Sequence, residues 1–441
     1  MRTLSQQPWS APCVGADFVC DAVVNVPGSK SETNRALVLA ALAAGPTRIM
    51  GGLVSRDSDL MLGALRQLGV VIDDERLAGD ESVWRVTPPS EFCVPVAAID
   101  CGLAGTVMRF VPPVAALNGG RTSFVGDRHA SQRPMEPLLD GLAQLGVALE
   151  GGATGIPFTQ DATAGLSGRS VRIDSSGSSQ FVSALLLVAA RLPEGVELTH
   201  VPAEAGASIP SRPHLDMTVS MLRARGVDVQ TPDENTWVVA PGPIAAVDAR
   251  VEPDLTSAAV FLAAATVTRG TVRVPGWPEQ TTQGGAAIVE LLRRAGASVD
   301  LVGDSLEVNG TGVLNALGEV DLHASSELTP VVAALAALAE GETRITGVAH
   351  IRGHETDRLA ALTTELGRIG VEVEETEDGL VIRGRGFRGL KGAVWNSYAD
   401  HRMSHAGALM GLLVEDLRVE DIACTTKTMA DFPGLWQGML T

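Results

Sequence analysis

The residues best suited to chemistry stand at the starts of apolar, Ala- and Leu-rich segments. The first of these starts, VPGSKSETNRALVLA (26–40), carries Lys30, then Ser31 as a candidate helix cap, then Arg35. The free N–H groups and the positive dipole end of a helix attract anions, and both cations would strengthen such a site. An exposed, capped helix with two solvated cations is the alternative, and this segment alone does not decide between them.

Four further starts combine small or hydroxyl side chains with arginine. Glycine lets a ligand approach the backbone closely, and hydroxyl and guanidinium groups suit a phosphate. No G-x-S-x-G turn surrounds the serines, so a serine nucleophile is not expected. Ordinary caps, turns and surface loops are the alternative at each start. The candidate binding residues are Gly105 and Thr106 in CGLAGTVMRF (101–110), Arg133 in GDRHASQRPMEPL (126–138), Ser178, Ser179 and Gln180 in DSSGSSQFVSALLL (174–187), and Ser211 in ASIPSRPHLDM (207–217).

The C-terminal half offers groups that exchange protons. Carboxylates, imidazoles and amines are the side chains whose pKa burial can tune toward neutrality, so acid–base chemistry is predicted here. Glu327 is expected in the first turn of a helix within 323–341. The other candidates are His354, Glu355 and Arg358 in HIRGHETDRL (350–359), His401 and Arg402 in SYADHRMSHAG (397–407), and Lys427 in TTKTMADFP (425–433).

A metal site is the competing interpretation of the histidines. His350 and His354 are four residues apart, as in H-E-x-x-H, but Glu355 lies outside the pair and no further ligand set is evident. We therefore expect no metal and no other cofactor.

The overall charge restricts the class of partner. Acidic residues outnumber basic ones 52 to 34, which gives a net charge of −18. General binding to nucleic acid or to an anionic membrane needs a positive face and is not expected. Five cysteines without C-x-x-C spacing, and a first stretch (1–20) without a long apolar core, favour a reducing cytoplasm.

A repeated pattern indicates the elements that must position these side chains. Five times a helix-like run ends in Gly and is followed by two short alternating segments with a polar turn between them. A left-handed glycine commonly ends a helix, and alternating segments are typical of half-buried strands. Between the hairpins lie runs that are apolar on nearly all sides and should be buried helices. The terminal glycines are Gly69, Gly146, Gly226, Gly296 and Gly370. The sequence therefore predicts an α/β protein of two similar domains, with helices inside, sheets outside and a break near 241–254.

Eight segments together resemble the 5-enolpyruvylshikimate-3-phosphate synthases. They occur in the family's order and are spread over almost the whole chain. Their combination is highly specific to the family, although each motif alone is only moderately specific. They are PGSKSETNRALVLAALA (27–43), LAGTVMRF (103–110), SQRP (131–134), SGSSQFVSALL (176–186), SRPH (211–214), HETDRL (354–359), ADHRMSHA (399–406) and TTKTMADFP (425–433).

The resemblance implies the two-domain enolpyruvyl-transferase fold, an inside-out α/β barrel with three repeated units in each domain. It assigns residues 1–28 and 249–441 to one domain and 29–248 to the other, with the active site in a cleft between them. The implied reaction transfers the enolpyruvyl group of phosphoenolpyruvate to the 5-hydroxyl of shikimate-3-phosphate and releases phosphate. It proceeds by addition and elimination, without a covalent bond to the enzyme. A cytoplasmic monomer, and sensitivity to glyphosate because Gly105 is retained, are also implied.

The resemblance carries roles over to matching positions. Glu327, with Lys30, would take the hydroxyl proton, and Glu355, with His401 nearby, would act as acid toward the methylene carbon of phosphoenolpyruvate. The shikimate-3-phosphate residues would be Lys30, Ser31, Arg35, Ser178, Ser179, Gln180, Ser211, Glu327, His350 and His354, and the phosphoenolpyruvate residues Gly105, Thr106, Arg133, Arg358, Arg402 and Lys427.

Four positions depart from the commonest family pattern. Leu103 stands where Asn is frequent, which puts an amide contact and the glyphosate sensitivity in question. Glu327 replaces the more usual Asp, His350 an Asn and His354 a Lys. An imidazole at 354 would make binding of shikimate-3-phosphate more dependent on pH.

Two other functions stay open at this point. The sister enzyme that acts on UDP-N-acetylglucosamine shares the fold, but it usually has a cysteine in the loop that aligns with 126–133, and this loop has none. A non-catalytic anion-binding protein on the same scaffold is the second, and the retained Glu327, Glu355, His401 and Lys427 argue against it.

Overall fold

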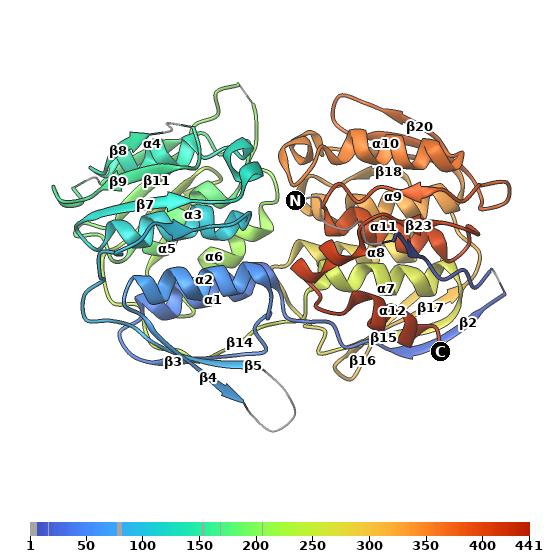
Figure 1. Ribbon diagram of the computed structural model, residues 1–441, viewed down its shortest axis with the longest axis horizontal. Helices are drawn as coiled ribbons and strands as arrows, with labels where there is room; N and C mark the ends of the chain where they lie inside the picture. Colours follow the sequence, from blue (N-terminus) through green and yellow to red (C-terminus); the bar gives the residue numbers. More distant parts are fainter. Residues whose placement is uncertain (1–6, 16, 77–81, 152–153, 168, 205) are drawn as a thin grey trace. The chain divides into compact units, whose positions relative to one another are not determined.

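The chain divides into two compact units (Figure 1). Unit 1 comprises residues 1–27 and 253–441, and unit 2 comprises residues 28–252. The sequence placed these boundaries at 28/29 and 248/249. The computed structural model describes residues 7–15, 17–76, 82–151, 154–167, 169–204 and 206–441. The turn of the first expected hairpin (77–81) and Gly152 of the second lie outside these residues.

One sheet topology recurs through the chain. In each four-stranded sheet the first two strands are parallel and the remaining neighbours are antiparallel. Among the described residues, unit 2 holds three such sheets. They are β14 (Ala249–Arg250), β3 (Thr47–Met50), β5 (Ser82–Thr87) and β4 (Val71–Arg76); β6 (Ile99–Asp100), β7 (Arg121–Val125), β9 (Phe158–Asp161) and β8 (Ala148–Gly151); and β10 (Ser170–Ile173), β11 (Val196–His200), β13 (Thr236–Val239) and β12 (Val229–Asp233).

Unit 1 repeats this topology twice and then departs from it. Within the described part of unit 1, the third sheet has three strands and draws them from both ends of the chain. The sheets are β2 (Val19–Val23), β15 (Arg269–Pro275), β17 (Ser305–Thr311) and β16 (Ser298–Val302); β18 (Gly318–Asp321), β19 (Glu340–Thr346), β21 (Leu380–Arg385) and β20 (Glu372–Glu375); and β1 (Trp9–Ser10), β23 (Arg418–Val419) and β22 (Val394–Trp395). The third sheet lacks a local hairpin in these residues, which explains why the sequence shows five copies of the pattern and not six.

Within the described ranges, six helices form the interiors of the two units, as predicted. Most of their residues are buried, and apart from polar residues near their starts these helices are mainly apolar on all faces. In Figure 1 the sheets lie outside them within each unit. The inner helices are α1 (Lys30–Leu42), α3 (Gly105–Ala116) and α5 (Gln180–Ala189) in unit 2, and α7 (Leu255–Val267), α9 (Thr329–Leu338) and α11 (His401–Gly411) in unit 1.

The remaining helices have one apolar face and one solvated face. α10 is typical, since its apolar residues recur at helical spacing while its other residues are charged or polar. These helices are α2 (Arg56–Gln67), α4 (Glu136–Gln144), α6 (Pro213–Arg223), α8 (Ile288–Arg294), α10 (Arg358–Ile369) and α12 (Phe432–Met439). None of the helices in the described ranges is long and apolar enough to cross a membrane.

The predicted glycine stops are confirmed. The backbone φ angles lie between 75° and 108° at Gly69, Gly146, Gly226, Gly296 and Gly370, which follow α2, α4, α6, α8 and α10. A side chain is strained at such angles, so glycine ends the helix and turns the chain into the next strand.

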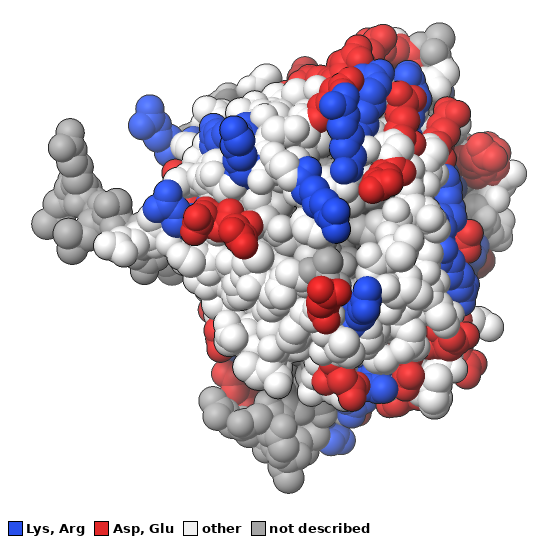
Figure 2. All heavy atoms as spheres, turned by 90° about the vertical axis from the view of Figure 1, so that its right-hand side faces the viewer, with Lys and Arg blue, Asp and Glu red and all other residues white. Residues whose placement is uncertain are grey.

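Acidic side chains on the outer strands have basic neighbours. Arg383 on β21 lies within 4 Å of carboxylates of Glu342, Glu372 and Glu374 on the adjacent strands. The face of the molecule in Figure 2 likewise carries Lys and Arg beside Asp and Glu. Such exposed pairs add little stability individually, but they break up the negative surface charge.

Candidate active site

The start of α1 places Lys30 beside a buried carboxylate. The Ser29 Oγ accepts a hydrogen bond from the Glu32 N–H at 3.5 Å, so Ser29 caps the helix. The predicted capping role of Ser31 is therefore wrong: α1 begins at Lys30, and Ser31 already lies in its first turn. The Lys30 Nζ lies 3.6 Å from Asp57 Oδ2 in the first turn of α2, which fixes the direction of the lysine.

Arg35 is buried and holds the inner helices of unit 2 together. Its Nε donates to Thr218 Oγ1 at 2.7 Å and its Nη2 to Ser183 Oγ at 3.3 Å, while Nη1 donates to the Ser31 carbonyl at 3.0 Å. Its guanidinium also lies 5.1 Å from the centre of the Phe110 ring. Burial lowers the pKa of Arg35 to about 9. Through these contacts Arg35 joins α1 to α3, α5 and α6. Its predicted contact with a ligand stays a prediction.

Two guanidinium groups lie against Gly105 at the start of α3. A Cβ at Gly105 would lie 2.8 Å from Arg109 Nη1 and 2.9 Å from both terminal nitrogens of Arg133. The Arg133 Nη1 donates to the Leu103 carbonyl at 3.0 Å, and the Thr106 Oγ1 accepts from Asn34 Nδ2 at 2.8 Å. A side chain at 105 would displace at least one of these guanidinium groups, so glycine lets both arginines lie against the helix start.

Arg109 is a site residue to which the sequence assigned no role. It is buried, its Nη1 donates to Gln180 Oε1 at 3.3 Å, and its Nη2 donates to the Pro134 carbonyl at 3.1 Å. It thereby ties the start of α3 to the start of α5. Its position four residues after Gly105, on the same helix face, was the available signal.

The start of α5 and the turn before α6 carry the remaining candidates of unit 2. The Ser178 Oγ accepts from the Gln180 N–H at 3.2 Å, and Ser179 is buried at the cap position. Ser211 has a φ of 51°, an uncommon value for a residue other than glycine. The structure brings these residues to helix starts, as expected.

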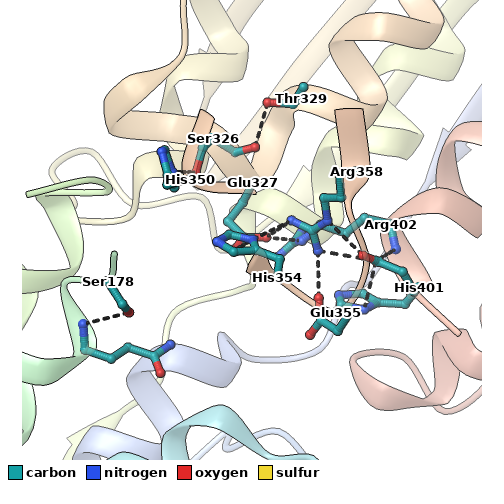
Figure 3. Close-up of polar contacts among 12 residues, drawn as sticks. Ser178, Ser326, Glu327, Thr329, His350, His354, Glu355, Arg358, His401 and Arg402 are labelled. Carbon is teal, nitrogen blue, oxygen red and sulfur yellow. Dashed lines mark hydrogen bonds and ion pairs between the residues drawn. The ribbon is translucent and has the colours of Figure 1, made fainter. Parts of the chain in front are cut away.

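Arg358 is the centre of the candidate site in unit 1 (Figure 3). The side chain is fully buried, and all five N–H donors of its guanidinium have acceptors. These acceptors are Asp400 Oδ2 at 2.8 Å from Nε, Glu327 Oε2 at 2.9 Å and His354 Nδ1 at 3.1 Å from Nη1, and Glu355 Oε2 at 2.8 Å and Asp400 Oδ1 at 3.3 Å from Nη2. Burial alone would lower the pKa of Arg358, but the three carboxylates raise it well above its ordinary value.

Glu327 lies between two arginines. The sequence placed it in the first turn of a helix, but it belongs to a 3-10 segment, His323–Leu328, that precedes α9. The segment contains a kink at Ser325, two residues before Glu327, and its last residues lead directly into α9. Burial opposes ionisation of Glu327, yet the charges of Arg402 and Arg358 hold the pKa of its carboxyl well below the usual range. Glu327 is therefore ionised at neutral pH.

Glu355 and the starts of α10 and α11 complete the cluster. The Lys427 Nζ donates to Glu355 Oε1 at 2.5 Å, and the Arg402 Nε pairs with Glu327. Asp400 caps α11, because its Oδ1 accepts from the Arg402 N–H at 2.9 Å. The predicted residues Glu327, Glu355, Arg358, Arg402 and Lys427 thus lie together, and Asp400 joins them as a residue to which the sequence assigned no role.

Three imidazole rings form a row that ends beside Glu327, since the His354 Nδ1 lies 3.6 Å from Glu327 Oε1. The centres of the His323 and His350 rings are 5.6 Å apart, and those of His350 and His354 are 5.8 Å apart. The His350 Nε2 shares a hydrogen bond with Ser326 Oγ at 2.9 Å. Burial, followed by the neighbouring His354 and His323, lowers the pKa of His350 to about 3, so this ring is neutral.

The donor atoms of Glu355, Asp400 and His401 lie within 4.8 Å of one another, close enough for a metal ion. Their surroundings do not fit one. Both oxygens of Asp400 accept from Arg358, and Glu355 lies between Arg358 and Lys427. A cation would compete with two protein cations for these oxygens, so we assign no metal here.

Solved enolpyruvyl transferases share this architecture. An EPSP synthase from Acinetobacter baumannii superposes with a TM-score of 0.77 at 24% identity, over 98% of this chain and 98% of that chain. A second structure of that bacterium's EPSP synthase gives 0.76 at 23%, over 96% and 97%. The enolpyruvyl transferase NikO from Streptomyces tendae gives 0.70 at 18%, over 97% and 96%. The predicted fold is confirmed.

The sequence itself matches one family over nearly its full length. The model of EPSP synthase (3-phosphoshikimate 1-carboxyvinyltransferase) aligns with residues 19–436, which include every candidate residue of both units. The chain therefore belongs to the EPSP synthase family, and both the polar helix starts of unit 2 and the cluster around Arg358 lie within the matched residues.

Proposed function

We propose that unit 2 binds shikimate-3-phosphate at the starts of α1, α5 and α6, and that phosphoenolpyruvate is bound at the start of α3 and at the cluster of unit 1. Family membership makes the protein an enolpyruvyl transferase of the shikimate pathway. The assignment of residues to the two substrates goes beyond that membership. It rests on the chemistry of each helix start, since both substrates are anions.

The cluster around Arg358 is the observation that carries the proposal. Arg402 and Lys427 keep 10% and 15% of their side chains exposed, whereas Arg358 is fully buried and has all its donors in use. Arg402 and Lys427 would therefore make the first contacts with phosphoenolpyruvate. Arg358 would follow when a substrate oxygen replaces one of its carboxylate partners.

Glu327 is proposed to take the proton of the attacking hydroxyl. In the free protein, Arg402 makes the carboxylate a weak base because it lowers the pKa. When phosphoenolpyruvate draws Arg402 into its own ion pair, Glu327 loses part of this stabilisation, and its proton affinity rises. The base would thus gain strength only in the presence of the substrate.

Glu355, paired with Lys427, is proposed to move the second proton. During addition, a proton goes to the methylene carbon of phosphoenolpyruvate while the hydroxyl oxygen bonds to the neighbouring carbon. During elimination, the methyl group returns that proton and phosphate leaves. Glu355 lies 2.5 Å from the ammonium group of Lys427, which can relay a proton to it.

Phosphate release is the decisive assay. We expect release from phosphoenolpyruvate with shikimate-3-phosphate and none with UDP-N-acetylglucosamine. Release with the sugar nucleotide alone would identify the sister activity, and release with neither would favour a binding protein. The variant Glu355→Gln should bind both substrates and lose about 10²–10⁴ in turnover. Glu372→Gln, on an outer strand, is the matched control and should retain full turnover.

A cytoplasmic, monomeric enzyme is the corresponding cellular proposal. All five cysteines are free, which fits a reducing compartment. Light scattering should give a mass near 45.8 kDa, and a mass twice as large would contradict the monomer.

A further inference from the structure

A carboxylate outside the cluster is buried on α10, two turns after Arg358. Glu365 is 0% exposed, although an isolated buried charge is costly. It has four donors: the Tyr398 hydroxyl at 2.7 Å, the Asn396 N–H at 3.1 Å, the Asn396 Nδ2 at 3.1 Å and the Arg368 Nη1 at 2.7 Å. Three of the four belong to residues 396–398, so Glu365 binds one short loop.

This loop holds two consecutive residues in an uncommon conformation. Tyr398 and Ala399 both have φ near 54°, in the left-handed region that favours glycine. Burial raises the pKa of the Tyr398 hydroxyl, and the hydrogen bond to Glu365 raises it further. The hydroxyl therefore keeps its proton and donates it to Glu365 in this hydrogen bond. Such a conformation persists only where surrounding contacts impose it.

The strained pair leads directly into the cluster. Asp400 follows Ala399, accepts from Arg358 and caps α11, whose first residues are His401 and Arg402. One helix therefore holds both ends of the loop: Arg358 at the start of α10 binds Asp400, and Glu365 binds residues 396–398.

We propose that Glu365 is a positioning residue for the transfer reaction, acting through the 396–399 loop to aim Asp400, His401 and Arg402. It has no part in binding substrate itself. The inference rests on the proposed function, in which Arg402 contacts phosphoenolpyruvate.

The test is the kinetics of Glu365→Gln in the full-length protein. An amide keeps the size of the side chain, but its NH₂ group faces donors where an oxygen accepted before. We expect the KM for phosphoenolpyruvate to rise by about ten-fold or more, with a change of less than about three-fold in the KM for shikimate-3-phosphate. Tyr398→Phe removes one of the four donors and should give a smaller change in the same direction.

A second substitution separates positioning from stability. Glycine adopts positive φ without strain, so Ala399→Gly in the Glu365→Gln background should recover part of the KM for phosphoenolpyruvate. Leu292→Ala, in the core of unit 1 on α8, is the control that lowers thermal stability and should leave this KM unchanged.

Three outcomes overturn the inference, and they are distinguishable. A folded Glu365→Gln protein with the wild-type KM for phosphoenolpyruvate refutes the positioning role alone. A KM that rises equally in Leu292→Ala shows that the effect is general destabilisation. A wild-type protein that releases no phosphate refutes the proposed function first, and the positioning role with it.

Discussion

Gly105→Ala is the substitution whose effect the structure defines most closely. The added methyl carbon would lie 2.8–2.9 Å from the terminal nitrogens of Arg109 and Arg133, closer than real Cβ atoms approach other atoms. Arg109 is buried and fixed by Gln180, whereas Arg133 is only partly buried. Arg133 is therefore the side chain that moves away.

The size of the effect follows from the contacts that Arg133 loses. Its hydrogen bond to the Leu103 carbonyl sets the direction of its guanidinium, and hydrogen bonds to charged groups contribute about 1.5–3 kcal/mol. If Arg133 binds phosphoenolpyruvate, the KM for this substrate should rise by about 10–100-fold. Helix formation itself does not suffer, because alanine is a better helix former than glycine.

Steady-state phosphate release at varied phosphoenolpyruvate concentrations measures this effect. Gly63→Ala is the matched control, since a Cβ at Gly63 in α2 meets no atom within 4 Å. It should leave the KM unchanged and stabilise the fold by up to about 1 kcal/mol. If the effect of Gly105→Ala passes through Arg133, it should nearly vanish in an Arg133→Ala background. A Gly105→Ala protein with a KM within about two-fold of wild type would refute the reasoning.

Three further predictions test other parts of the site. Arginine charges hold the pKa of Glu327 below its unfolded value of about 4.3, so the ionised Glu327 stabilises the fold above that pH, and this stabilisation is lost as the pH falls further. Acid unfolding followed by circular dichroism should therefore depend less steeply on pH in Glu327→Gln than in the wild type. An identical curve would contradict the assignment. Burial lowers the pKa of His405 to about 3, so as the pH falls the unfolded chain binds a proton at this ring before the folded chain does. The free energy of unfolding therefore falls below about pH 6.5, by roughly 2 kcal/mol at pH 5. Urea unfolding at pH 7 and pH 5 should show this loss in the wild type and not in His405→Gln. Ser178→Ala should raise the KM for shikimate-3-phosphate by about 3–10-fold, as expected for one hydrogen bond, and an equal rise for phosphoenolpyruvate would place Ser178 elsewhere.

Local patterns made the helix starts predictable. Gly69 and its four counterparts end helices because their left-handed backbone conformation strains a side chain. A hairpin follows each glycine, and the next inner helix begins with a polar segment. Those starts carry the candidates of unit 2. The two-residue error at Ser31 arose because serine is a good cap at either position, 29 or 31, and only the fold selects between them.

Contacts between distant segments were not predictable from local patterns. The sheet of β1, β22 and β23 joins residues about four hundred positions apart, so the sequence contains no local hairpin pattern that would predict this sheet. Glu365 illustrates the same limit within the site. On the sequence it is one more acidic residue of an amphipathic helix, and its burial depends on a loop about thirty residues further on.

The cluster in unit 1 also explains how an acidic protein can serve anionic substrates. The chain carries a net charge of −18, yet Arg358, Arg402 and Lys427 face Glu327, Glu355 and Asp400, so the cluster itself is close to neutral. Under the proposed function, a substrate anion entering this cluster would not meet free cations; it would replace internal carboxylates. Each displaced carboxylate gains proton affinity as it loses its partner. Binding and proton transfer would thereby be coupled through the same ion pairs, because the proposed base and acid are both partners of the cations that would hold phosphoenolpyruvate.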